Sequence, residues 1–147
     1  MARVISIANQ KGGIGKSSSV IEIASVFSIE YNKKVLIIDL DQQRNLSKYI
    51  GADIETDKKG HNLIPSIYDV LTSDAFTIDS IQHLSHFDAI SASEQLSKAD
   101  CTFMDSDEEL SYTGYCSFKN SVMNLSPGLT GKTDINYPFM LLHLFHH

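Results

Sequence analysis

The residue types best suited to chemistry gather in one short run, Asn9 to Ser18 (NQKGGIGKSS), with three glycines, two lysines and two serines. Glycines let backbone N–H groups converge on an anion, because side chains would block close approach and several turns need a positive φ. Lysine adds positive charge, and a serine hydroxyl group can ligate Mg²⁺. The run therefore predicts a phosphate-binding loop, and the alternative is a glycine-rich turn that binds nothing.

Such a loop needs a strand that leads into it and a helix that leaves it. Residues 3–8 (RVISIA) are mostly apolar or β-branched without strong alternation, which predicts a buried strand of a parallel sheet. From Lys16 to residues 31–32 we expect a helix, whose N-terminus would bring its dipole and unpaired N–H groups to the loop. Apolar residues at i, i+3, i+4 and i+7 give this helix one buried face: Val20, Ile23, Ala24 and Phe27.

Two acidic residues follow a second predicted strand. Residues 35–38 (VLII) form an uninterrupted apolar run that ends in Asp39, and Asp41 comes two residues later. A strand, a helix and a second strand in this order form a βαβ unit with a right-handed crossover. A carboxylate at the carboxyl end of a parallel strand faces the crevice where ligands bind. Both acids are therefore candidate site residues, and the alternative for Asp39 is a capping role alone.

The remaining sequence up to residue 100 predicts more elements of the same kind, and together they indicate an α/β fold with a parallel sheet and flanking helices. We expect a loop and a short helix in 42–52, an exposed polar loop at 53–62, a helix over 65–71 that begins at its proline, a strand at 87–91 and the start of a helix at 93–96.

Length and composition set wide limits on the function. A chain of 147 residues with 42% hydrophobic and 20% charged residues is typical of one globular domain. The net charge of −6 argues against nucleic-acid binding over the whole surface. The two cysteines form no metal-ligand pattern, and no signal peptide or membrane-spanning run is recognisable. The expected compartment is the cytoplasm.

The composition changes near residue 110. Only three of the charged residues, Lys119, Lys132 and Asp134, lie in 110–147, and this segment shows no clear helical or strand period. We therefore divide the chain into a nucleotide-binding part, 1–109, and a tail of unknown structure, 110–147. The hypothesis for the tail is that it is read out of frame or comes from a truncated gene.

Two segments resemble one protein family. KGGIGKS (residues 11–17) resembles the deviant Walker A motif K-G-G-x-G-K-[ST] of the ParA/MinD superfamily of ATPases, whereas the strict G-x-x-x-x-G-K-[ST] pattern fails at Gln10. VLIIDLDQQRNLS (residues 35–47) resembles the family's apolar run followed by D-x-D-P-Q-x-N-L-[ST], with Gln42 in place of proline. A weaker match over 86–100 extends the resemblance to about residue 108.

The resemblance implies a P-loop NTPase-like fold, ATP and Mg²⁺ as ligands, and a role for each matching residue. Lys11 would reach across a dimer interface to the partner's nucleotide, and Lys16 would reach the β- and γ-phosphates. Asp41 would position the attacking water, and Ser17 with Asp39 would serve the metal ion. The residues implied in phosphate binding are Lys11, Gly12, Gly13, Ile14, Gly15, Lys16, Ser17 and Ser18.

For the whole protein, the resemblance implies a switch for plasmid or chromosome partitioning. Its implied partners are a second copy in an ATP-dependent homodimer, a ParB-like adaptor and, in the full-length family, non-specific DNA at the nucleoid. The family also carries a later strand that ends in an aspartate, but no acid follows the apolar run at 138–145. The fold is therefore predicted to be incomplete at its C-terminal side.

Two other interpretations of the sequence stay open. One is a non-catalytic truncated fragment that lacks the later aspartate. The other is a different deviant Walker A protein, such as a MinD-like ATPase, a bacterial tyrosine kinase, an amidotransferase-like synthetase or the nitrogenase iron protein.

Overall fold

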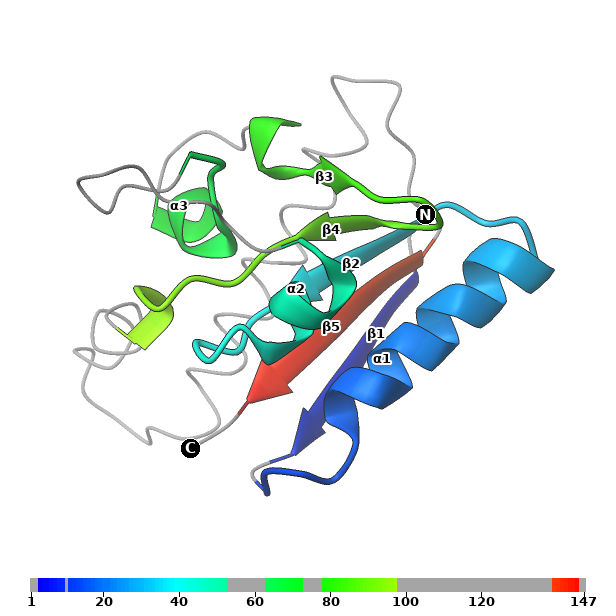
Figure 1. The fold of residues 1–147 in the computed structure, drawn as a ribbon, viewed down its shortest axis with the longest axis horizontal. Helices are drawn as coiled ribbons and strands as arrows, with labels where there is room; N and C mark the ends of the chain where they lie inside the picture. Colours follow the sequence, from blue (N-terminus) through cyan, green and yellow to red (C-terminus); the bar gives the residue numbers. More distant parts are fainter. Residues whose placement is uncertain (1–2, 10, 53–62, 73–77, 98–138, 146–147) are drawn as a thin grey trace.

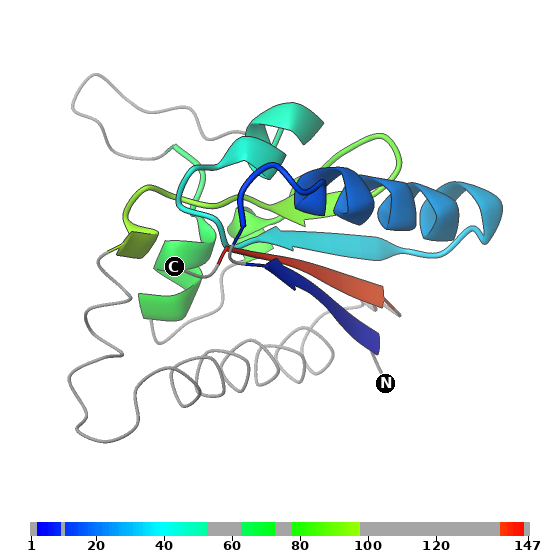
Figure 2. The ribbon, with the colours of Figure 1, turned by 90° about the horizontal axis from the view of Figure 1, so that it is seen from below.

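The computed structural model describes residues 3–9, 11–52, 63–72, 78–97 and 139–145. These residues form one five-stranded sheet with helices on both of its faces (Figures 1 and 2). The α/β class predicted from the sequence is confirmed.

The sheet has the strand order β1-β5-β2-β4-β3. Four of its strands run parallel, and the short β3 pairs antiparallel with β4. The strands are β1 (Arg3–Asn9), β2 (Val35–Asp39), β3 (Gln82–His83), β4 (Asp88–Ile90) and β5 (Phe139–Phe145). The three strands predicted from the sequence correspond to β1, β2 and β4, whereas β3 and β5 were not predicted.

Strand β5 lies between β1 and β2, although it comes from the segment in which the sequence showed no strand period (Figure 1). Leu141 is in register with Ile5 on one side and with Ile37 on the other. A strand with neighbours on both sides carries a continuous apolar run rather than an alternating one. This central strand was therefore not predicted, because its apolar and polar residues do not alternate.

The helices are α1 (Lys16–Ser25), which continues as a π-helical segment over Val26–Glu30, then α2 (Asn45–Ile50), α3 (Ile67–Thr72) and a 3₁₀ turn (Ile78–Ser80). Helices α1 and α2 cover one face of the sheet, and α3 lies on the other (Figure 2). The predicted extent of the first helix is confirmed, and a new helix begins at residues 96–97. The predicted loop at 53–62 lies outside the described residues.

Helix α3 begins after Ser66 rather than at Pro65, where the sequence placed its start. Ser66 donates two hydrogen bonds to Asp69 Oδ2, one from its backbone N–H and one from its hydroxyl group. Each of them is 2.7 Å long. The Asp69 side chain thus satisfies a donor at the helix start, as the acid of a capping box does.

The core has two halves because β2 buries side chains on both of its faces. Leu36 and Ile38 pack with Ile67 of α3 and its neighbours on one face. Val35 and Ile37 belong to the cluster on the other face, which includes residues of α1 and α2. This explains why residues 35–38 are all apolar.

Strand β1 is less buried than the sequence predicted. It forms one edge of the sheet among the described strands, and none of its seven residues is fully buried. Ile5 and Ile7 pack against the α1 side of the core, whereas Ser6 and Ala8 are exposed. The prediction of a buried strand was wrong here, because β1 has a described neighbour on one side only.

Candidate functional site

The glycine-rich segment 11–15 joins β1 to α1, and two of its glycines adopt left-handed backbone conformations. Gly13 has φ +72° and Gly15 has φ +84°, and Gly15 is the N-cap residue of α1. Non-glycine residues are strained in this region. Apart from the glycine itself and its chain neighbours, no heavy atom among the described residues lies within 4 Å of the position that a Cβ would take at Gly12, Gly13 or Gly15. The space beside the loop is therefore open, as backbone contact with a phosphate requires.

The first turn of α1 adds N–H groups to this loop. The first hydrogen bond of the helix runs from the Ser19 N–H to the Gly15 carbonyl oxygen over 2.9 Å. The N–H groups of Lys16, Ser17 and Ser18 precede it and so lie outside the intrahelical ladder. Together with the helix dipole, such groups favour an anion at this end.

The two lysines of the segment differ in their surroundings. Lys16 is buried, with 9% of its surface exposed, and its Nζ donates a hydrogen bond to the Lys11 carbonyl oxygen over 3.1 Å. This bond folds the ammonium group back onto the loop. Lys11 is exposed, and its backbone N–H donates to Asn9 Oδ1 over 2.9 Å. Asn9 thus shapes the start of the loop, a role that was not predicted from the sequence.

The predicted acids lie at the same edge of the sheet as the loop. β1 and β2 both run parallel to β5, so their carboxyl ends point the same way, with Asn9 in register with Phe145 and Asp39 with His143. Asp39 and Asp41 are both buried, at 1% and 4% exposure. The structure therefore brings the loop and the two acids to one edge, as the βαβ pattern predicted.

The carboxylate of Asp39 accepts at least three hydrogen bonds from protein groups. Oδ1 accepts a hydrogen bond of 3.1 Å from the Asp41 N–H. Oδ2 accepts one of 2.9 Å from the Ser47 N–H and one of 2.6 Å from Ser47 Oγ. Ser47 Oγ in turn accepts from the Ala92 N–H over 3.1 Å. Ser47 was not among the site residues predicted from the sequence. Its signal was the [ST] position that closes the second motif.

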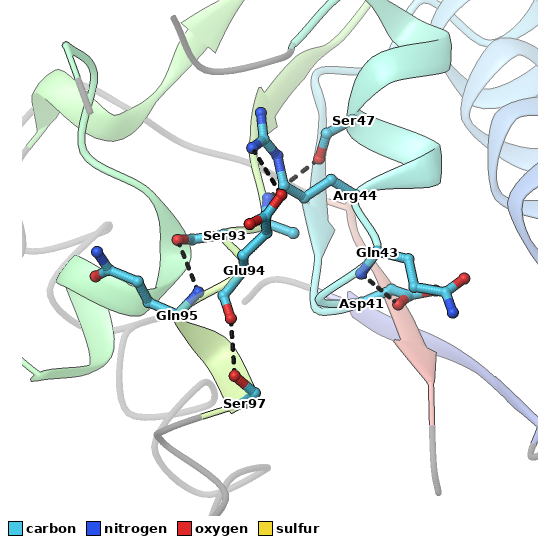
Figure 3. A network of polar contacts seen from close by, with 9 residues as sticks. Asp41, Gln43, Arg44, Ser47, Ser93, Glu94, Gln95 and Ser97 are labelled. Carbon is cyan, nitrogen blue, oxygen red and sulfur yellow. Dashed lines mark hydrogen bonds and ion pairs between the residues drawn. The ribbon is translucent and has the colours of Figure 1, made fainter. Parts of the chain in front are cut away.

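Asp41 is held through its backbone and one carboxylate oxygen. Its Oδ1 accepts a hydrogen bond of 2.9 Å from the Gln43 N–H (Figure 3). Its carbonyl oxygen accepts a hydrogen bond of 2.8 Å from the Arg44 N–H. Within the part of the chain that the structure describes, Asp41 Oδ2 makes no hydrogen bond. These bonds define the turn at the position where the family usually has proline and this chain has Gln42.

Arg44 ends this turn in a left-handed conformation, with φ +60°, and precedes α2 as its N-cap residue. Its guanidinium group lies 4.0 Å from the carboxylate of Glu94, in the turn after β4 (Figure 3). Because the Glu94 side chain is 82% exposed, this ion pair contributes at most about 1 kcal/mol to stability.

Comparison with known proteins identifies the family. A family model described as an AAA domain matches residues 2–125. The chromosome partitioning protein ParA of Caulobacter vibrioides is 35% identical over 97 residues, which are 65% of this chain and 34% of that protein. The chain belongs to this AAA-domain family and to the ParA/MinD superfamily. The family match also runs past residue 109, where the composition changes.

Solved structures of this superfamily's fold match almost the whole chain. A plasmid partition protein from Borrelia burgdorferi with bound AMPPNP has a TM-score of 0.64 and 28% identity, and the match covers 96% of this chain and 52% of that one. Cobyrinic acid a,c-diamide synthase from Mycobacterium smegmatis with a bound ATP analogue and magnesium has a TM-score of 0.71 and 24% identity. The match covers 97% of this chain and 51% of that one. The P-loop NTPase-like fold is confirmed.

The chain spans 23–38% of the length of the curated relatives that it matches. Among the described residues, no group of three or more His, Cys, Asp or Glu side chains is placed to hold a metal ion. The helices of that part of the chain also fall short of what a bilayer span requires in length and apolar character.

Proposed function

We propose that the chain is a ParA-type nucleotide-binding module that binds ATP with Mg²⁺ at the carboxyl edge of its sheet. The observation that carries this proposal is the geometry between β1 and α1. Gly15 sits in the left-handed region at the N-cap, and the Lys16 ammonium group is folded onto the loop. Solved relatives with bound nucleotide and magnesium support the same ligands.

Each residue of the loop has a proposed task. The backbone N–H groups of segment 11–18 would surround the phosphates, and the Lys16 ammonium group would exchange its contact with the Lys11 carbonyl for a phosphate oxygen. The Ser17 hydroxyl group would hold Mg²⁺. The bound ion supplies charge neutralisation on the phosphates.

Asp41 is the proposed residue for hydrolysis. A carboxylate that positions a water molecule needs an oxygen that is not already committed, and Asp41 Oδ2 makes no hydrogen bond within the described residues. Asp41→Ala is expected to lower any hydrolysis while ATP binding persists. Unchanged hydrolysis in this variant would contradict the assigned role.

The proposed role in the cell is a nucleotide-dependent dimerisation switch for plasmid or chromosome partitioning in the cytoplasm. Relatives named for partitioning support it, and the exposed Lys11 is suited to reach a second copy. The partners proposed with it are a ParB-like adaptor and non-specific DNA, as implied by the resemblance.

A second candidate is a module that binds ATP without hydrolysing it. The observation that favours it is β5, because this strand lies beside β1 and β2 but is followed in the sequence by histidines, where the family's later strand carries an aspartate. Steady-state hydrolysis by a wild-type chain that binds ATP separates the two candidates, because only the first predicts turnover.

Calorimetric titration with Mg·ATP tests the proposed function. Wild-type protein should bind one equivalent, and Lys16→Ala should bind at least about tenfold more weakly, because an ammonium group on the phosphates is lost. Lys34→Ala is the matched control, because Lys34 is exposed and precedes β2 at the opposite edge of the sheet. A folded wild-type protein without saturable binding would overturn the proposal.

A further inference from the structure

A buried pair of side chains connects three elements next to the proposed nucleotide site. Asp39 ends β2, Ser47 lies in α2, and Ala92 follows β4. The Ser47 hydroxyl group donates to Asp39 Oδ2 and accepts from the Ala92 N–H, and both side chains are almost completely buried. We propose that Asp39 and Ser47 are positioning residues that fix segment 39–47, and that Asp39 acts in this way rather than as a ligand of Mg²⁺.

The contacts of Asp39 argue against direct ligation. Its carboxylate has about four lone-pair sites, and protein donors already use at least three of them. If an Asp39 oxygen gave up one of these donors to ligate Mg²⁺, a buried N–H or hydroxyl group of Asp41 or Ser47 would lose its acceptor, which is unfavourable.

The same contacts fit a capping role. The Ser47 N–H belongs to the first turn of α2, where helical donors have no intrahelical partner. The N-cap residue Arg44 provides no side-chain cap, and Asp39 Oδ2 accepts this donor instead. A negative charge at a helix N-terminus is also favourable. Asp39 thus caps α2 from the end of β2.

Asp39 also sets the backbone of the residue proposed for hydrolysis. The Asp41 N–H donates to Asp39 Oδ1, and Asp41 is two residues further along the same turn. The turn is closed by the bonds from Gln43 and Arg44 to Asp41. The orientation of the Asp41 carboxylate therefore depends on Asp39, although Asp39 need not touch the nucleotide.

Ser47 is hydrogen-bonded to Ala92, and the neighbouring Ser91 is itself held by two hydrogen bonds. Next to Ala92, the Ser91 carbonyl oxygen accepts from the Ile67 N–H over 2.9 Å, and Ser91 Oγ accepts from Gln82 Nε2 over 3.0 Å. These bonds come from α3 and β3. A large displacement of segment 39–47 relative to Ala92 would break the hydrogen bond between Ser47 and Ala92.

Amide hydrogen exchange on the nucleotide-free, full chain tests the pair without relying on the proposed function. In Ser47→Ala the Ala92 amide should exchange about tenfold faster or more, because its acceptor is lost. Ser47→Thr keeps a hydroxyl group and should stay within about threefold of wild type. Equal exchange at Ala92 in wild type and Ser47→Ala would overturn the proposal.

A magnesium titration of ATP binding tests the role of Asp39, and this arm rests on the proposed function. Ser17→Ala, which removes a proposed ligand, should raise the Mg²⁺ concentration at half-binding by about tenfold. Asp39→Asn and Ser47→Ala should raise this concentration by less than Ser17→Ala does, because both variants leave the proposed Ser17 ligand in place. An increase in Asp39→Asn equal to that in Ser17→Ala would make Asp39 a ligand and overturn the proposal.

Two complications are resolved by the same set of variants. If Asp39→Asn does not fold, Ser47→Ala still reports on the pair, because it leaves the carboxylate in place. If wild-type protein binds no ATP, the proposed function fails, and exchange at Ala92 decides on the positioning pair by itself.

Discussion

Ser47 Oγ and Asp39 Oδ2 lie 2.6 Å apart, and neither side chain is more than 1% exposed to solvent. A buried carboxylate is stable only when donors surround it, so this contact is part of what allows a charge at the end of β2. The same hydroxyl group satisfies the Ala92 N–H. One serine therefore serves two buried groups on two other elements.

Ser47→Ala is expected to lower the free energy of unfolding by about 1–3 kcal/mol, because it leaves an acceptor of Asp39 and the donor of Ala92 unsatisfied. Urea denaturation measures the change. Ser19→Ala is the matched control, because the Ser19 hydroxyl group is exposed and donates only to Gly15 within its own helix. It should change stability by no more than about 0.5 kcal/mol. Equal effects of the two changes would contradict the importance of the buried pair.

Gly15→Ala and Gly12→Ala should separate backbone strain from ligand contact. Gly15 has φ +84°, so an alanine there is expected to cost about 1–2 kcal/mol of stability. Gly12 is not in the left-handed region and has open space at its Cβ position, so Gly12→Ala should cost no more than about 0.5 kcal/mol.

Both alanine variants should nevertheless weaken ATP binding, because a methyl group would occupy space that the proposed phosphate needs. Thermal unfolding and ATP titration of the same preparations give the two quantities. Gly12→Ala with unchanged stability and unchanged affinity would show that Gly12 does not approach the nucleotide.

The sequence predicted those elements of the fold that depend on a few consecutive residues. The apolar period of α1, the continuous apolar run of β2 and the glycines between β1 and α1 each constrain a few consecutive residues. The same patterns placed Asp39 and Asp41 beside the loop, because parallel strands share a carboxyl edge. The roles of the individual loop residues stay predictions.

The features that the sequence did not predict depend on contacts between distant residues. Strand β5 pairs with β1 and β2 although its register partners lie 136 and 104 positions earlier in the sequence (139 − 3 and 139 − 35), and no local pattern specifies those neighbours. The edge position of β1 follows from the same pairing. The bond from Ala92 to Ser47 spans 45 positions. Only the assembled sheet brings these groups together.

Glu94→Gln should have almost no effect on stability, despite the ion pair that it removes. The Glu94 carboxylate is 4.0 Å from the Arg44 guanidinium group and is mostly exposed, so the free energy of unfolding should change by no more than about 0.5 kcal/mol. Urea denaturation at low and high salt measures it. A loss above about 1 kcal/mol that disappears in high salt would show that this pair stabilises the turn before α2.

Leu141→Pro is expected to abolish cooperative unfolding or to lower stability by about 3 kcal/mol or more, because proline removes a ladder donor from a strand paired on both sides. Leu141 is in register with Ile5 of β1 and Ile37 of β2, so a defect there affects both neighbours. Leu141→Val is the matched control, since it keeps the N–H group and a β-branched side chain suits a strand. Circular dichroism during thermal unfolding compares the two variants. If Leu141→Pro unfolds as wild type does, β5 is not part of the stable sheet, and the hypothesis that residues 110–147 are not native gains support.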